Sequence, residues 1–157
     1  MYPYNIDKPI QKAAREGSLP VPISSDERLL ELIVMAMQDE VNDATKYKKM
    51  SEETTDEESK DILRSMYLDE NRHKVLLNEI YTSLSGNGVP EITTEKVDEK
   101  ISYTDQLKKN ITEEVEGARF YRDLSLMLTD DYLKHILFSI LDDEQNHSIL
   151  NMYLLMK

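Results

Sequence analysis

Hydrophobic residues recur along four segments of the chain at alternating steps of three and four, the spacing of one face of an α-helix. These patterns predict helices over about residues 26–52, 56–84, 103–128 and 130–156. Ser24, Thr55 and Thr129 fit the caps at three of the predicted starts. The clearest stripe contains Leu63, Met66, Glu70, His73, Leu77, Ile80 and Leu84. We therefore expect an all-α protein of four helices.

Glycine, asparagine and proline break the pattern at residues 85–101. At about 3.3 Å per extended residue this segment can span about 55 Å, whereas a helix of about 27 residues is about 40 Å long. It is therefore long enough to be a crossover between two antiparallel helical hairpins. We expect residues 25–157 to form the bundle. Residues 1–24 hold four of the five prolines and are expected to form an extended arm, with one helical turn around residues 10–15.

The chain also carries an internal repeat. Glu70 and His73 form a Glu-x-x-His motif that returns as Glu144 and His147, 74 residues later. The same shift aligns many further pairs, among them Glu40 with Glu114, Tyr47 with Tyr121 and Asp69 with Asp143. The repeat indicates a duplicated helical hairpin.

The spacing of the acids about each turn predicts where they meet. Glu40 and Glu70 lie about 14 and 16 residues from the first turn, so both are about 21 to 24 Å from it. Glu114 and Glu144 have the same spacing about the second turn. We therefore expect four glutamates and two histidines in one layer at the middle of the bundle.

Four buried glutamates are costly unless a cation accompanies them. A dinuclear metal site removes that cost. Carboxylate and imidazole ligands suit iron or manganese, and ligand type alone leaves zinc and cobalt open. The sequence thus predicts a metal site with Glu40, Glu70, His73, Glu114, Glu144 and His147 as ligands.

Composition excludes several other functions. The chain has 31 acidic and 19 basic residues and a net charge of −12, which argues against nucleic-acid binding. The chain contains no cysteine, so thiolate metal sites and thiol nucleophiles are excluded. No apolar stretch reaches the length of a membrane span, and the polar N-terminus does not resemble a signal peptide. We expect a cytoplasmic protein.

These motifs resemble the ferritin-like superfamily, in particular rubrerythrin and bacterioferritin, from Asp26 to about Met156. The resemblance implies that Glu70 and Glu144 bridge two iron ions. Glu40 and Glu114 would then be terminal carboxylates, and His73 and His147 terminal nitrogen ligands. It also implies supporting roles for two pairs of residues. Tyr47 and Tyr121 are expected to form hydrogen bonds with the opposing carboxylates. Asp69 and Asp143 are expected to bind the outer ring nitrogens of the histidines and so orient them.

The resemblance has two departures. Rubrerythrins carry an extra carboxylate three residues after the third helix's glutamate, where this chain has Gly117. They also commonly carry a four-cysteine rubredoxin domain, which this chain lacks. Two other residues near the motifs are interpreted as bystanders: His135 as a surface histidine and Asp43 as a solvated acid.

The leading hypothesis is a rubrerythrin-like di-iron oxidoreductase that reduces peroxide or dioxygen in oxidative stress or iron homeostasis. Its electrons would come from an external donor such as rubredoxin. The first alternative is a ferritin-like protein that binds and oxidises iron, and the second is a non-catalytic structural bundle whose site is vestigial or filled by zinc. We expect a homodimer.

Overall fold

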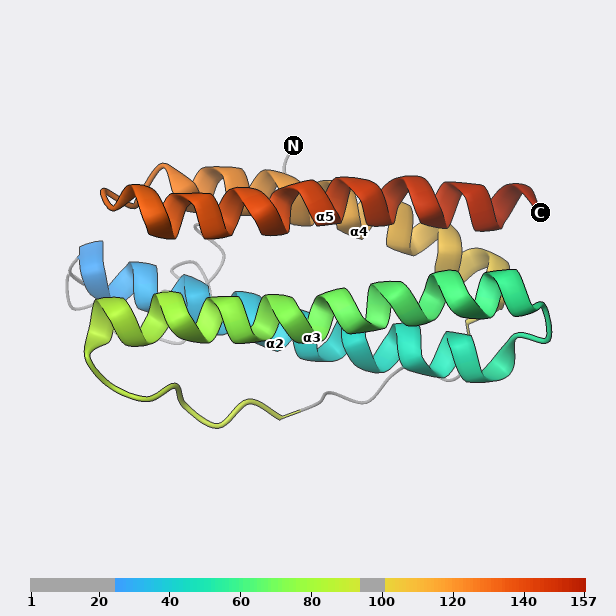
Figure 1. Ribbon diagram of the computed structural model, residues 1–157, viewed down its shortest axis with the longest axis horizontal. Coiled ribbons are helices and arrows are strands. Elements are labelled where there is room, and N and C mark those ends of the chain that lie inside the picture. The colour runs from blue at the N-terminus through green and yellow to red at the C-terminus, as the bar shows by residue number, and fades with distance from the viewer. Residues whose placement is uncertain (1–24, 94–100) are drawn as a thin grey trace, which may run out of the picture.

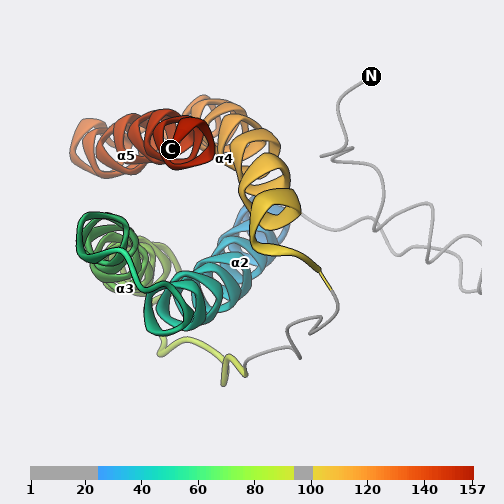
Figure 2. The ribbon, with the colours of Figure 1, turned by 90° about the vertical axis from the view of Figure 1, so that its right-hand side faces the viewer.

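The computed structural model describes residues 25–93 and 101–157, which form an all-α four-helix bundle. Its helices are α2 (Ser25–Glu53), α3 (Glu57–Ser85), α4 (Tyr103–Ser125) and α5 (Asp131–Met156). The hairpin of α2 and α3 packs face to face on the hairpin of α4 and α5, with α3 beside α5 and α2 beside α4 (Figures 1 and 2). The predicted bundle is confirmed. The predicted arm, its helical turn and Ser24 lie outside the described residues.

Three helices begin at side-chain caps. Asp56, Ser102 and Asp130 each have extended backbone, and each accepts a hydrogen bond from the backbone N–H three residues later. The prediction of Thr55 and Thr129 as caps was therefore wrong by one residue. In both cases the aspartate that follows the threonine supplies the capping oxygen, and it adds negative charge at the positive end of the helix dipole.

Two helix ends have different causes. After α3, Gly86 has a φ of 67°, the left-handed conformation that glycine adopts without steric cost. The helix α4 ends at Ser125, before the predicted end at Leu128. There the N–H groups of Met127 and Leu128 donate to carbonyls three residues back, at 3.0 and 3.3 Å, which tightens the chain into a turn.

The connection after α3 leaves one end of the bundle, and α4 begins at the opposite end (Figure 1). Its described part packs Val89 and Ile92 against the core. The side-chain amide of Gln38 donates to the carbonyl of Thr93 at 2.6 Å and holds the segment to α2. Residues 94–100 lie outside the described part of the chain. In the described residues, no helix is long and apolar enough to cross a membrane.

The apolar core has two parts, separated by a polar layer. The larger cluster includes Ile33, Leu77, Tyr121, Leu137 and Ile140. The smaller cluster contains Tyr47, Met50, Leu63, Met66, Leu107 and Leu154. Between these clusters every helix carries one of the predicted glutamates, and α3 and α5 each carry a predicted histidine as well. The fold therefore places the acidic layer in the middle of the bundle, away from both ends.

Candidate metal centre

The polar layer gathers all six predicted ligands. One glutamate comes from α2 (Glu40) and one from α4 (Glu114), while α3 and α5 each supply a glutamate and a histidine. All six residues are at least 95% buried. They form two groups, in each of which the ligand atoms lie within 4.8 Å of one another. One group is Glu40, Glu70, His73 and Glu144, and the other is Glu70, Glu114, Glu144 and His147.

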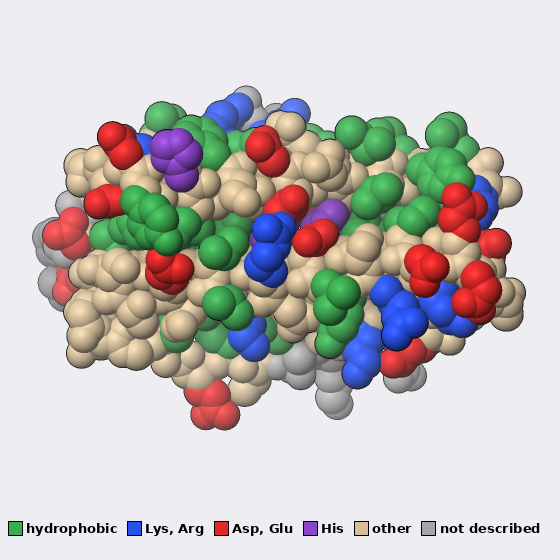
Figure 3. Space-filling view, in the orientation of Figure 1, with side chains coloured by type: hydrophobic (Ala, Val, Ile, Leu, Met, Phe, Trp, Pro, Cys, Tyr) green, Lys and Arg blue, Asp and Glu red, His purple; other side chains and the backbone are tan. Residues whose placement is uncertain are grey.

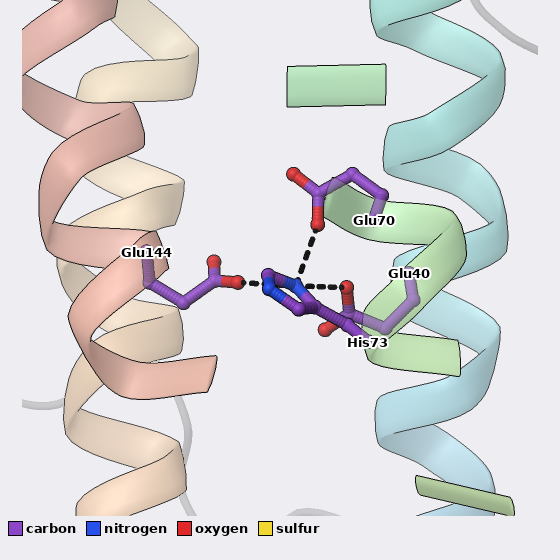
Figure 4. Close-up of side chains that lie close together, drawn as sticks. All are labelled: Glu40, Glu70, His73 and Glu144. Atoms are coloured by element: carbon purple, nitrogen blue, oxygen red, sulfur yellow. Dashed lines mark hydrogen bonds and ion pairs between the residues drawn. The ribbon is translucent and has the colours of Figure 1, made fainter. Parts of the chain in front are cut away.

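The first group converges on one imidazole nitrogen (Figure 4). Nδ1 of His73 lies 3.1 Å from Glu40 Oε2, 3.0 Å from Glu70 Oε2 and 3.2 Å from Glu144 Oε1. These carboxylates come from three different helices. A nitrogen that faces three carboxylates inside a buried layer is a suitable arrangement for binding a cation with mixed oxygen and nitrogen ligands.

The second group supplies the clearest test of whether a metal fits. Four buried side-chain atoms have no hydrogen-bond partner in the described part of the chain: Glu70 Oε1, Glu114 Oε2, Glu144 Oε1 and His147 Nδ1. Each residue of the second group contributes one of these atoms. A buried polar atom without a hydrogen bond costs about 1 to 3 kcal/mol. These atoms have only ion-pair contacts with other residues of the layer, among them Glu70 Oε1 with His147 Nδ1 at 3.0 Å and Glu144 Oε1 with His73 Nδ1 at 3.2 Å. A bound divalent cation would give all four atoms a partner. The residues therefore fit a metal.

Burial and the close approach of like charges shift the pKa values of several side chains in this layer. Burial, followed by the negative charge of Glu40, raises the pKa of Glu70 to about 8. Burial and the charges of the neighbouring glutamates also raise the pKa of Glu144 well above its usual value. Burial alone would lower the histidine values, but the carboxylates outweigh it. They raise the pKa of His73 far above its usual value and that of His147 to about 9. Glu70, Glu144 and both histidines therefore bind protons more tightly than free side chains do.

The two buried tyrosines connect the hairpins. The hydroxyl of Tyr47 on α2 donates to Glu114 on α4, and the hydroxyl of Tyr121 on α4 donates to Glu40 on α2. Burial, followed by the charge of the bonded carboxylate, raises the pKa of each phenol well above its usual value. Each tyrosine therefore stays protonated and fixes one oxygen of a carboxylate, which leaves the other oxygen for a metal.

The two aspartates also act across the hairpins. Asp143 Oδ2 lies 3.1 Å from Nε2 of His73, and Asp69 Oδ2 lies 3.4 Å from Nε2 of His147. The partner of each histidine is thus the aspartate of the opposite hairpin, although an aspartate lies one turn before each histidine on its own helix. These contacts orient the histidines with Nδ1 toward the glutamates.

Arg72 covers this arrangement from outside. Its guanidinium pairs with Asp143 and lies 3.3 Å from Asp69 Oδ1, so it bridges α3 and α5. Acidic and basic side chains lie against one another midway along the face formed by these helices, with hydrophobic side chains around them (Figure 3). The arginine side chain is 48% exposed, so its ion pairs are expected to contribute little to stability.

Asp143→Ala is expected to cost more stability than Arg72→Ala. The aspartate change removes the partner of a fully buried imidazole nitrogen, which costs about 1 to 3 kcal/mol. The arginine change removes half-exposed ion pairs, which contribute less than about 1 kcal/mol. Urea unfolding of the metal-free variants measures both, with exposed Asp142→Ala as the control. Equal losses for D143A and R72A would contradict the assigned role of Asp143.

Lys46 is a neighbour of the site that sequence reasoning missed. It is buried, and its Nζ lies 2.5 Å from Asp43, 3.3 Å from Glu113 and 5.1 Å from the ring centre of Tyr47. Asp43 is thus half-buried and ion-paired, and its interpretation as a solvated acid was wrong. Burial, opposed by the charge of Lys46, raises the pKa of Asp43 to about 6. His135 is exposed, as expected.

Gly117 lies against the site. A Cβ built at this position would lie 3.0 Å from Glu144 Oε2, closer than ordinary van der Waals contact. A side chain here would require the Glu144 carboxylate to shift by a few tenths of an ångström. Glycine at residue 117 therefore leaves room for Glu144 in its present position.

A four-helix bundle whose core holds four glutamates and two histidines in this arrangement defines a ferritin-like protein with a metal-capable carboxylate and histidine cluster. The family model described as Rubrerythrin matches residues 31–155. The chain therefore belongs to the rubrerythrin family. No curated protein matches the chain.

A solved structure of a hypothetical protein from Pyrococcus furiosus has the same fold. It superposes with a TM-score of 0.72 at 22% sequence identity, over 88% of this chain and 95% of that one. At this identity the likeness shows the fold alone.

Proposed function

We propose that this protein is a rubrerythrin-type di-iron oxidoreductase that reduces peroxide or dioxygen, with peroxide as the preferred oxidant. The observation that carries the proposal is the set of four buried atoms without a hydrogen bond within a cluster of four glutamates and two histidines. Oxygen and imidazole ligands without thiolate suit iron. Glu70 and Glu144 belong to both ligand groups, which supports them as the bridging ligands.

Two iron ions would supply the two electrons that peroxide reduction consumes. Reduction of one peroxide takes two electrons and two protons, breaks the oxygen–oxygen bond and yields two waters. The residues of this chain hold and order the site. Tyr47 and Tyr121 fix Glu114 and Glu40, and the apolar clusters on both sides exclude bulk water.

A separate electron carrier is part of the proposal, because the chain has no cysteine with which to bind an iron–sulfur centre. Rubredoxin is the expected donor. This partner, the homodimer and the cytoplasmic location remain predictions.

Gly117 favours one alternative. Rubrerythrins carry an extra carboxylate at this position that takes part in their peroxide chemistry, and here even a Cβ would crowd Glu144. A ferritin-like protein that takes up iron and oxidises it with dioxygen is therefore the second candidate.

Metal analysis and rapid mixing distinguish the two functions. Protein reconstituted with Fe²⁺ is expected to hold about two irons per chain and to be oxidised faster by peroxide than by air, followed by absorbance of the ferric product. Rubredoxin and its reductase should sustain turnover. The variant His73→Gln should lose this behaviour, whereas exposed His135→Gln should retain it.

Three results would contradict the proposal in different ways. Oxidation by air as fast as by peroxide, with no re-reduction by the donor, would favour the iron-oxidising alternative. Uptake of many irons per chain would point to storage. Binding of zinc alone, with refusal of iron on reconstitution, would leave the structural bundle.

A further inference from the structure

A chain of buried side-chain amides leads to the metal layer from one side. The amide nitrogen of Gln106 donates to Asn110 Oδ1 at 2.7 Å, and the amide nitrogen of Asn110 donates to Asn151 Oδ1 at 3.0 Å. The amide nitrogen of Asn151 donates to the hydroxyl oxygen of Tyr47 at 2.8 Å, and that hydroxyl donates to Glu114. All five side chains are buried. We call Gln106, Asn110 and Asn151 the amide chain.

Every donor in this series points toward Glu114. Hydrogen bonds that run in one direction polarise one another and strengthen together. Because the oxygen of Tyr47 already accepts from Asn151, the hydroxyl proton of Tyr47 is directed to Glu114. Asn151 is itself anchored, since its amide also donates to the backbone carbonyl of His147 at 2.9 Å.

Within the described residues, the corresponding positions of the repeat form no such chain. Shifted by 74 residues, the positions of Gln106, Asn110 and Asn151 correspond to Leu32, Ala36 and Leu77. These three apolar residues belong to the larger core cluster.

The two tyrosines consequently differ in their surroundings. Within the described residues, the hydroxyl of Tyr121 donates to Glu40 but accepts a hydrogen bond from no side chain. The hydroxyl of Tyr47 both donates and accepts. The repeat has kept the ligands and the tyrosines but has changed what holds one tyrosine in place.

The methionines around the amide chain also differ from their counterparts in the repeat. The Sδ of Met50 lies 3.7 Å from the amide nitrogen of Asn110, and the Sδ of Met66 lies 3.8 Å from that of Asn151. Their repeat counterparts are Leu124 and Ile140. Burying amides is unfavourable unless they are hydrogen-bonded, and the apolar half shows that this fold packs without them. The amide chain therefore has a role other than filling the core.

We propose that Asn151, held by Asn110 and Gln106, is a positioning residue that orients Tyr47 and through it Glu114. The metal affinity of the position formed by Glu114 and His147 thereby depends on Asn151, while that of the position formed by Glu40 and His73 does not. This inference rests on the proposed function, because it takes the cluster to bind two metals. It makes the two halves of a duplicated site inequivalent.

Asn151→Leu is a suitable test variant, because the corresponding residue of the repeat is Leu77. Calorimetric titration of Mn²⁺ into the full-length metal-free protein is expected to show two binding steps. In N151L one step should weaken about tenfold, the lower end of the effect of losing an outer partner of a metal ligand. The other step should not change.

Combined variants show whether Asn151 acts through Tyr47. Tyr47→Phe should weaken the same step, and the double variant N151L/Y47F should bind no more weakly than Y47F alone. Tyr121→Phe should weaken the other step and add to N151L independently. In Glu40→Ala the remaining metal position is the one formed by Glu114 and His147, so adding N151L should weaken its binding step. In Glu114→Ala the other position remains, and adding N151L should not change its affinity.

The possible results separate the two proposals. If the unaltered protein binds two Mn²⁺ and N151L changes neither step, or both equally, the inference fails and the proposed function stands. If the unaltered protein binds no metal, both fail. Should N151L not fold by circular dichroism, Asn110→Ala and Gln106→Leu, which copy Ala36 and Leu32, provide the same measurement with less disturbance of the tyrosine.

Discussion

Glu70→Ala is expected to abolish the binding of both metal ions, whereas Glu40→Ala is expected to abolish the binding of only one. Glu70 offers an oxygen to each ligand group, and Glu40 belongs to one group alone. Metal at about 1,000 times its dissociation constant stabilises a protein by about 4 kcal/mol per site. For a domain of this size that shifts the unfolding temperature by about 10 °C or more. Thermal unfolding with and without Mn²⁺ should therefore show a shift for the unaltered protein and none for E70A.

The matched control for this prediction is Asp61→Ala, which removes an exposed acid from the same helix. It should retain the full metal-induced shift. Glu144→Ala, which removes the other glutamate shared by both groups, should behave as E70A does. A variant E70A that still binds one metal with unaltered affinity would show that Glu70 does not bridge, and the assignment of the two groups would have to be revised.

The height of each ligand could be predicted from the sequence because helices have a fixed rise. Glu40 and Glu70 lie at similar distances from the turn between α2 and α3, and the repeat copies this spacing in Glu114 and Glu144. A rise of about 1.5 Å per residue turns spacing into position. The structure accordingly brings the four glutamates and two histidines into one buried layer.

Contacts between α3 and α5 could not be predicted in the same way. Asp69 lies one turn before His73, yet it approaches His147, and Asp143 approaches His73. This crossing depends on how the two hairpins are rotated against each other, and spacing within one helix carries no information about that rotation. The bridge that Arg72 forms between α3 and α5 depends on the same rotation. The repeat gives no sign of it either, because the residue that corresponds to Arg72 is Asn146.

The amide chain did leave a signal in the sequence. Asn110 and Asn151 stand on apolar stripes, and their repeat counterparts Ala36 and Leu77 are apolar. Positions where a duplicated pattern disagrees with itself are therefore as informative as positions where it agrees. Lys46, whose counterpart is Phe120, is a further example. In both cases the departures lie on the side of Tyr47 and Glu114.

The metal-free protein is expected to lose stability as pH rises from about 5 to about 9. The pKa of Glu70 is raised from its usual 4.5 to about 8, chiefly by burial, and that of His147 from 6.5 to about 9 against burial by its carboxylate neighbours. Both groups therefore bind protons more tightly in the folded chain. Their stabilising effect is complete below the unfolded pKa and is lost as pH rises through the folded pKa. Since one pKa unit corresponds to about 1.4 kcal/mol, urea unfolding with a chelator should show a loss of a few kcal/mol.

Metal should reverse this trend, because protons compete with the cation for the same oxygen and nitrogen atoms. With saturating Mn²⁺, stability should therefore rise between pH 5 and pH 8. General repulsion among surface acids does not account for this difference, since the net charge of the surface is the same with and without the chelator. The variant E70A offers a second separation, because it keeps the surface but removes one of the two titrating groups. Its metal-free stability should fall less steeply with pH. An equal slope in E70A would place the origin of the pH dependence outside the buried layer.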